Sequence, residues 1–240
     1  MKFTYEAASG GTSGGRLTLV VPSGWTAPQR THATGAGYVA TSAGTVAVSG
    51  HTITVSGLTM STGQKVTLTY AKATAPSTVG AETWVATERS VAAGTSTPLA
   101  SSPHLVVYGK DGAGAATPSP SSVVHKTTGK TLAFTFTVGS GGMNDGAVTL
   151  VVPSGWSAPQ RTMSTGAGYV TANAGSVSVS GRTITVSGLT KTAGQKITIS
   201  VRHASAPTTA LGNQTWTMRE RSTLAGRLTA IASSPVIKVT

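Results

Sequence analysis

The sequence predicts an all-β protein that consists of two tandem immunoglobulin-like antiparallel β-sandwich domains. The first observation is an internal duplication, in which residues 15–76 recur as residues 146–207 at a constant offset of 131, with about two-thirds of the positions identical. The second is the alternation of apolar with hydroxylated residues, which is the period of a half-buried strand. The third is a turn signal roughly every ten residues, which is typical of a sandwich.

The duplication extends over most of both halves of the chain. The recurring blocks are VPSGWTAPQR from Val21 against VPSGWSAPQR from Val152, GAGYV from Gly35 and Gly166, TITVSGLT from Thr52 and Thr183, and, after one inserted residue, WVATERS from Trp84 against WTMRERS from Trp216 and ASSP from Ala100 and Ala232. Blocks that recur in one order at one spacing indicate two copies of one domain.

The repeat also predicts the domain boundaries. We expect repeat 1 at residues 1–108, a linker at residues 109–121 because of its Gly, Ala, Pro and Ser content, and repeat 2 at residues 122–240. Met1 aligns with Leu132, so residues 121–130 have no counterpart in the first copy. We therefore expect repeat 1 to lack its first strand, and to be the less stable copy or to be completed by a strand of another chain.

Strands are expected throughout both copies. In the second copy apolar residues alternate over 132–138 and 196–201, and the run 148–152 ends at a proline, which cannot donate to a ladder. The segments 177–179 and 184–186 are joined by Ser-Gly-Arg, a tight hairpin turn. Residues 214–221 continue the alternation, and no helical period occurs. We expect about seven to eight strands in each copy.

Composition excludes several classes of protein. Lys and Arg number 18 against 6 Asp and Glu, but charged residues are only 10% of the chain and the basic ones are scattered singly, which disfavours nucleic acid as a partner. A polyanion such as a cell-surface polysaccharide remains a candidate partner. No cysteine and no apolar run of membrane-spanning length occurs. The first residues lack the apolar core of a signal peptide, so an extracellular or cell-surface protein would carry its signal outside this chain.

Catalytic and metal-binding residues are not expected, and neither is a cofactor, so we do not expect an enzyme. No histidine position is shared by the two copies, and the GTSGG block at Gly11 loses its serine in the second copy. A Ser nucleophile in such a block also needs a strand-to-helix turn. Asp111 and Asp145 are the only aspartates, whereas calcium requires several carboxylates.

Glu88 and Glu220 are the polar residues that both copies retain next to a tryptophan. Each follows its Trp by four residues, so strand geometry places the carboxylate on the same face as the indole. A carboxylate in that position needs a partner. We expect a structural pair with the shared basic residues, which are Arg30, Arg161, Lys65 and Lys196.

An alternative role for these glutamates is as the proton shuttle of a Lys-to-Asn or Lys-to-Asp crosslink. Such crosslinks occur in many Gram-positive surface domains. The first copy, however, contains no Asn and no Asp before Asp111. Because duplicated sites should share their chemistry, we disfavour this alternative.

The aromatic residues shared by the copies allow two interpretations. Trp25, Trp156, Tyr38 and Tyr169 would suit a ligand face that stacks on sugar rings. The Trp of PSGW would equally fold back as a lid over the end of the sandwich, because large aromatic side chains are usually buried. We favour the lid.

The recurring blocks resemble Thr/Gly-rich immunoglobulin-like tandem repeat domains of bacterial surface and adhesin-type proteins. The resemblance implies a structural, non-catalytic stalk segment in an extracellular array, with neighbouring repeats or copies of itself as partners in cell adhesion. It provides no ligand residues. Two alternatives stay open: a subunit of an extracellular filament assembled by β-strand complementation, and a carbohydrate- or cell-wall-binding module.

Overall fold

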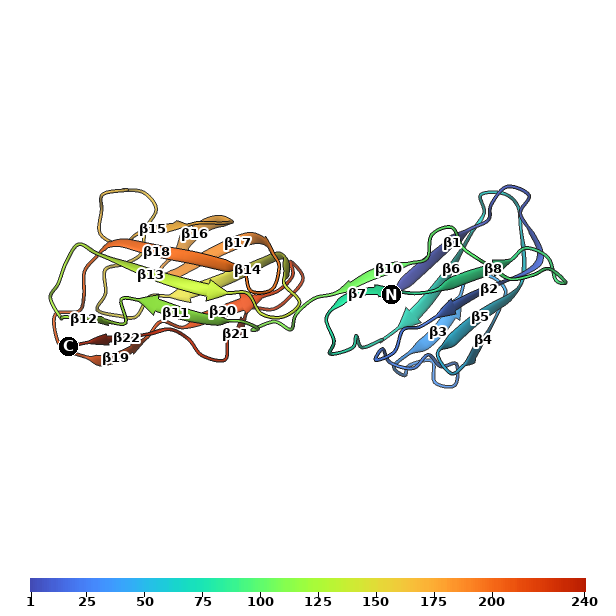
Figure 1. Cartoon of the computed structure of the whole chain (residues 1–240), viewed down its shortest axis with the longest axis horizontal. Helices are drawn as coiled ribbons and strands as arrows, with labels where there is room; N and C mark the ends of the chain where they lie inside the picture. The colour runs from blue at the N-terminus through green and yellow to red at the C-terminus, as the bar shows by residue number, and fades with distance from the viewer. The chain divides into compact units, whose positions relative to one another are not determined.

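The computed structural model describes all residues from Met1 to Thr240, and every regular element in it is a β-strand. The chain divides into two compact units, Met1–Val107 (unit 1) and Tyr108–Thr240 (unit 2) (Figure 1). Unit 1 contains strands β1 to β10 and unit 2 contains β11 to β22. These totals exceed the expected seven to eight because each unit includes strands of two to four residues that the sequence pattern does not resolve.

Unit 1 consists of two principal sheets and one short pair. The sheets have the strand orders β1-β6-β3 and β4-β5-β2-β8-β9, and β7 pairs with β10. The strands are β1 Lys2–Glu6, β2 Thr12–Val20, β3 Tyr38–Thr41, β4 Thr45–Ser49, β5 Thr52–Met60, β6 Lys65–Ala71, β7 Gly80–Thr83, β8 Ala86–Arg89, β9 Thr97–Pro98 and β10 His104–Val107. All pairings within unit 1 strands are antiparallel.

Unit 2 repeats this plan with two additional strands. Its sheets have the orders β11-β13-β18-β15, β16-β17-β14-β20-β21 and β12-β22-β19. The strands are β11 Ala115–Ser119, β12 Ser122–Val123, β13 Lys130–Thr137, β14 Met143–Val151, β15 Tyr169–Ala172, β16 Ser176–Ser180, β17 Thr183–Lys191, β18 Lys196–Ala204, β19 Gly212–Thr215, β20 Met218–Arg221, β21 Thr229–Ala230 and β22 Val236–Val239. The β12–β22 pair alone is parallel.

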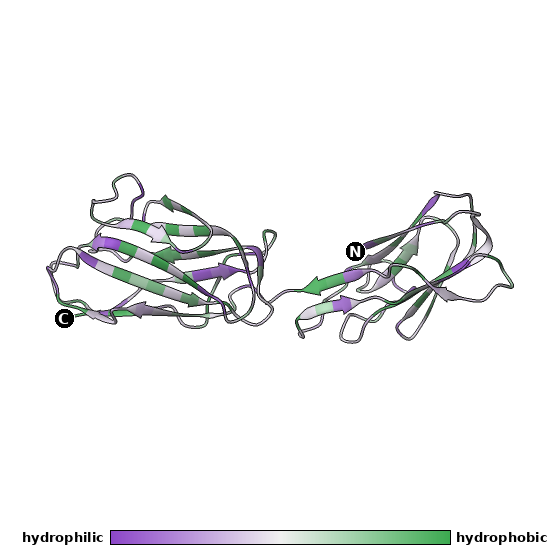
Figure 2. Cartoon of the chain, turned by 45° about the horizontal axis from the view of Figure 1, so that its top comes forward, coloured by the Kyte–Doolittle hydropathy of each residue, from purple (hydrophilic) through white to green (hydrophobic).

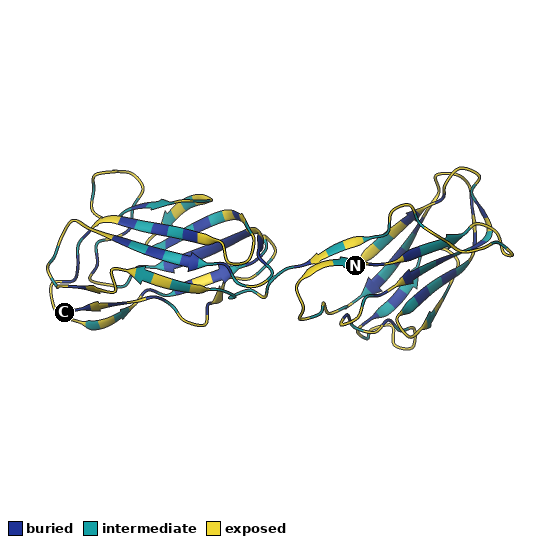
Figure 3. Cartoon of the chain, viewed as in Figure 1, coloured by how far each residue is buried: buried dark blue, intermediate teal, exposed yellow.

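Period-2 alternation builds a separate core in each unit. Ile53 and Val55 in β5, like Ile184 and Val186 in β17, are fully buried, whereas the Thr and Ser residues between them remain partly exposed. Figure 2 shows the alternation of hydropathy along the strands, and Figure 3 shows the matching alternation of burial. Because apolar burial is the main driving force of folding, each unit forms its own sandwich.

The segment predicted as a linker is instead part of unit 2. Residues 115–119 form β11, which pairs antiparallel with β13 from Ala115 opposite Thr137 to Ser119 opposite Ala133. The composition suggested a linker because small residues and proline are common in linkers. Small residues and Pro118 also suit an edge strand, in which every second backbone N–H faces solvent and needs no partner strand. Unit 1 has no counterpart of β11 or β12, so β1 is the edge of its sheet.

Candidate functional site

Glu220 is a buried carboxylate held by hydrogen bonds. It lies in β20 with 1% of its surface exposed. The backbone N–H of Gly112 donates to Oε2 at 2.6 Å, and the Ser222 hydroxyl donates to Oε1 at 2.8 Å. Burial raises the pKa of Glu220, while these two hydrogen bonds act in the opposite direction. Glu220 therefore fastens the segment before β11 to the second sheet of unit 2.

Glu88, the counterpart in unit 1, has only half of this arrangement. Its Oε1 accepts a hydrogen bond from the Ser90 hydroxyl at 2.6 Å, which matches the Ser222 contact. No residue of unit 1 takes the place of Gly112, and Glu88 is partly exposed. The same residue is thus a buried anchor in unit 2 and a partly exposed carboxylate with one hydroxyl partner in unit 1.

The expected pairing of these glutamates with the shared basic residues is wrong. The Arg30 and Arg161 guanidinium groups donate instead to the backbone carbonyls of Val39 and Val170, at 2.7 and 2.6 Å. Lys65 forms an exposed ion pair with Glu6 at 3.3 Å, and Lys196 has no carboxylate within 4.0 Å. Backbone N–H and hydroxyl groups satisfy a carboxylate without burying a second charge, which is less costly than a buried ion pair.

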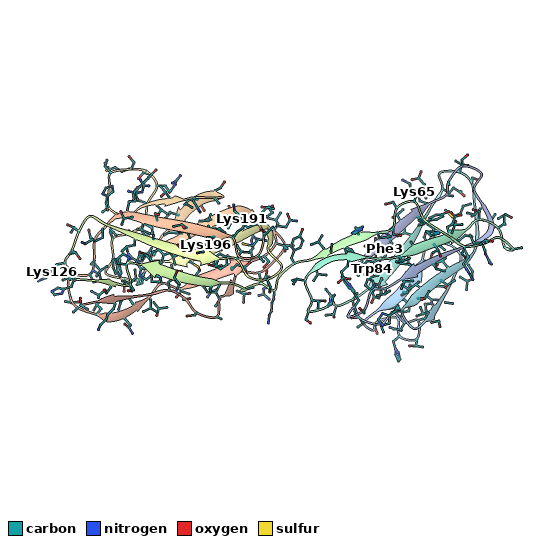
Figure 4. The ribbon with its side chains drawn as sticks, in the orientation of Figure 1. Phe3, Lys65, Trp84, Lys126, Lys191 and Lys196 are labelled. Carbon is teal, nitrogen blue, oxygen red and sulfur yellow. The ribbon has the colours of Figure 1, made fainter.

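None of the lysines is buried (Figure 4 labels four of them). The Lys-to-Asn crosslink would require a Lys amine inside the core beside the amide, so this geometry does not support it. Of the candidate amides, Asn173 accepts a backbone hydrogen bond from Thr198 at 2.8 Å.

The tryptophans proposed for a ligand face lie in the cores. Trp25 is 9% exposed and packs edge-on against Trp84 with ring centroids 5.1 Å apart, and Trp156 is 3% exposed and packs in the same way against Trp216 at 5.4 Å. The ligand-face interpretation of these two residues is therefore wrong. Burial of the large indole surface over the sandwich end provides the physical reason.

Tyr38 and Tyr169 remain half-buried at the surface. The guanidinium of Arg30 lies 5.5 Å from the Tyr38 ring centroid, and that of Arg161 lies 5.7 Å from the Tyr169 centroid. Each ring thus has a cation over one face in both copies. In each unit this contact holds the loop that contains the Gln-Arg pair against β3 or β15, so the role of the tyrosine is structural.

No group of three or more His, Asp or Glu side chains is close enough to hold a metal ion. The GTSGG block forms a bulged start of β2 in which Ser13 bonds through its backbone N–H to Ser90, not a strand-to-helix turn. The structure also contains no helix with the length and apolar character needed to cross a membrane.

The feature that differs between the two copies is a groove along β1. Its volume is about 270 Å³, and β1 forms one wall with Phe3 and Tyr5, while Leu17, Leu99 and Pro103 contribute to the other. Burial, followed by the nearby Glu88 carboxylate, raises the pKa of Tyr5 to about 12. The Tyr5 hydroxyl is buried and lies near the Glu88 carboxylate, but it has no partner in hydrogen-bond geometry within 3.5 Å. An apolar trough beside an unpaired strand edge is a binding geometry for extended peptide.

Sequence reasoning missed the residues that fill this position in unit 2. Asp111 and Gly112 lay inside the expected linker, yet Asp111 accepts hydrogen bonds from the backbone N–H groups of Ser222 at 2.8 Å and Arg227 at 2.7 Å. The Asp-Gly pair directly before a run of small residues was the available signal. It is a common turn signal, however, and its partners lie more than 100 residues away.

Comparison with known proteins finds similarity among solved structures. No protein-family model and no curated protein matches it. Among solved structures it is similar to the collagen adhesin of S. aureus, at 11% sequence identity and a TM-score of 0.34, over 99% of this chain and 86% of that chain. It is also similar to a protein of Corynebacterium diphtheriae described as membrane-anchored, at 8% identity and a TM-score of 0.34, over 100% of this chain and 86% of that chain. At these scores the likeness carries no argument about function.

Proposed function

We propose that the chain is a non-catalytic structural and adhesive module, a tandem stalk segment of a bacterial extracellular surface protein. The carrying observation is that several polar and aromatic residues shared by the two copies serve the fold: Glu220 fastens a segment, Arg30 and Arg161 hold loops, and Trp25 and Trp156 pack into the cores. A repeated domain whose shared residues are structural is suited to extending an array.

Two measurements test the stalk function. Antibodies raised against the chain should label intact cells of the source organism as strongly as permeabilised cells, and labelling after permeabilisation alone would refute the surface location. Pulled by its ends, the chain should unfold in two steps. The extended lengths should be about 370 Å for unit 1 and about 460 Å for unit 2, from about 3.5 Å per residue, because each unit has its own core.

A second candidate function is favoured by the open edge of β1. In this case the chain is a subunit of an extracellular assembly in which a neighbouring polypeptide adds a strand to unit 1. Electron microscopy of the purified chain with its cell-surface neighbours should then show regular end-to-end particles. Carbohydrate binding by stacking loses its proposed Trp residues because they are buried, so we do not pursue that alternative.

A further inference from the structure

Each unit contains a five-residue strand with an open outer edge inside the repeat. β4 and β16 are the outermost strands of the five-stranded sheets (Figure 1), and only β5 or β17 supplies hydrogen bonds to them. Their sequences, TVAVS and SVSVS, pair in regular register and contain neither a charged residue nor a proline. Charge, proline and bulges are the devices that ordinarily stop an edge from recruiting another strand. Both copies therefore present an edge that is open to strand addition.

The edge of β15, in the other sheet of unit 2, is closed by contrast. The backbone N–H of Gln160 donates to the Gly168 carbonyl at 2.9 Å, and the N–H of Val170 donates to the Gln160 carbonyl at 3.0 Å. Unit 1 makes the same two bonds at the edge of β3. The loop that contains the Gln-Arg pair thus covers one sheet edge in each unit and leaves β4 or β16 uncovered.

A groove of about 420 Å³ lies between this loop and β16. Gln160, Arg161 and Thr162 line it from the loop, and Val177 and Val179 line it from the strand. Unit 1 has the same residue types at the five matching positions, which are Gln29, Arg30, Thr31, Val46 and Val48. Because the duplication retains the whole set, we expect one groove of this kind in each unit.

The register of the β16–β17 hairpin determines what the edge presents to a partner. A two-residue turn closes the hairpin at the Ser180–Thr183 pair, so every second residue from Ser180 back to Ser176 directs its N–H and C=O to β17. The N–H and C=O groups of Val177 and Val179 then point away from the sheet. Their side chains are half-buried at the margin of the core. In an antiparallel strand added here, the residues opposite these valines would place their side chains in the groove.

The charge of the groove specifies the partner further. The Arg161 guanidinium donates to the Val170 carbonyl and forms no ion pair, and none of the six acidic residues of the chain lines the groove. A carboxylate on an incoming strand would complement this cation. The edge of a second copy provides no carboxylate and brings its own arginine, in a chain with a formal net charge of +12. No aromatic side chain lines the groove, so it offers no stacking surface to a polysaccharide.

We propose that the groove beside β16 and the matching edge of β4 each bind an extended acidic segment of a partner polypeptide. The segment runs antiparallel to the edge and bonds to the free N–H and C=O groups of Val177 and Val179, or of Val46 and Val48. Its groove-facing residues combine a small apolar side chain, which covers the valines, with a carboxylate that meets the arginine. The proposal deepens the adhesive part of the proposed function and rests on it, because it names the chemistry of the adhesion partner.

A blocked heptapeptide, Thr-Glu-Thr-Val-Thr-Glu-Thr, titrated into the full chain, tests the proposal by calorimetry and hydrogen exchange. We expect two peptides per chain, one for each unit, with new amide protection confined to the valines of β4 and β16. Replacement of both peptide glutamates by lysine should weaken binding at least about 10-fold, because the lysines repel the arginine. N-methylation of the valine and both glutamates removes the N–H groups that face the edge, and it should abolish binding.

Variants of the chain assign the two sites. Val177→Pro removes an N–H that faces solvent, which an edge strand tolerates, and it should reduce the binding from two peptides to one. Addition of Val46→Pro should reduce it to none. Ser178→Ala is the matched control: it introduces the residue that unit 1 has at this position, Ala47, and should leave two peptides bound. The N-methylated peptide keeps the test valid if a proline variant fails to fold, because it leaves the chain unchanged.

Four results would overturn the proposal. They are the absence of heat and protection at about 1 mM peptide, equal binding of the N-methylated peptide, tighter binding of heparin that the proline changes do not affect, and self-association of the chain that those changes abolish and the peptide does not. The third result would assign the arginines to a polysaccharide, and the fourth would assign the edges to a second copy. Peptide binding by a chain that is absent from the cell surface would support the sites and refute the surface function alone, whereas surface labelling without peptide binding would refute the sites alone.

Discussion

Replacement of Glu220 by Ala should destabilise unit 2 much more than replacement of Glu88 destabilises unit 1. Glu220 is buried and accepts hydrogen bonds from Gly112 and Ser222. Hydrogen bonds to a charged group contribute about 1.5–3 kcal/mol each, and relief of the buried charge offsets part of their loss. We expect a loss of about 2–4 kcal/mol for Glu220→Ala, and of about 1 kcal/mol or less for the partly exposed Glu88→Ala, which loses one hydroxyl contact.

Native-state hydrogen exchange in low denaturant measures the two free energies of unfolding separately in the intact chain. Glu220→Gln is the control, because its amide still accepts from Gly112 and donates to the Ser222 oxygen, and it should lose less than about 1 kcal/mol. Equal losses in the two alanine variants would refute the reasoning, since the segment that begins at Tyr108 would then contribute nothing to holding Glu220.

Three further outcomes follow from the same contacts. The stability of unit 2 should decrease as pH rises from about 4.5 through the raised pKa of Glu220, because the Glu220 carboxyl group binds its proton more tightly in the folded unit than in the unfolded chain. Denaturant unfolding across pH measures this decrease, which should disappear in Glu220→Gln. Trp25→Ala and Trp156→Ala should each cost about 3–5 kcal/mol in the free energy of unfolding of their own unit, and a change in polysaccharide binding without a change in stability would contradict their place in the core. Tyr5→Phe should raise the stability of unit 1 by about 1 kcal/mol, because it removes a buried hydroxyl without a partner. Tyr70→Phe should lower the stability of unit 1, because it loses a hydrogen bond to a backbone carbonyl. Thermal melts in which both variants change the melting temperature in the same direction would contradict this assignment.

Local patterns predicted much of the fold. The alternation in residues 52–59 and 183–190 predicted β5 and β17 with the correct residues inside, because a strand exposes alternate side chains to opposite faces whatever its partners are. The same rule placed Glu220 on the buried face with Trp216. It did not identify the partner of the carboxylate, because backbone N–H groups are available from every residue and leave no mark in the sequence.

The sequence predicted the candidate site at β1 only as a difference between the two copies. Alignment of the copies indicated that unit 1 lacks its first strand, and it assigned the unmatched part to residues 121–130. The strand that closes unit 2 lies earlier, at Ala115–Ser119. Small residues and proline have no apolar alternation to identify a strand, so only pairing with β13 distinguishes β11 from a linker.

By itself, then, the sequence determined that this protein is a duplicated β-sandwich, because repeats and period-2 alternation are properties of neighbouring residues. The tertiary structure alone decided that Trp25 is core, that Asp111 fastens β11, and that β1 has an open groove. Those facts depend on contacts between segments far apart in the chain, as between Gly112 and Glu220, 108 residues away. Hydrogen bonding and burial in the folded unit select such contacts, and no pattern among neighbouring residues encodes them.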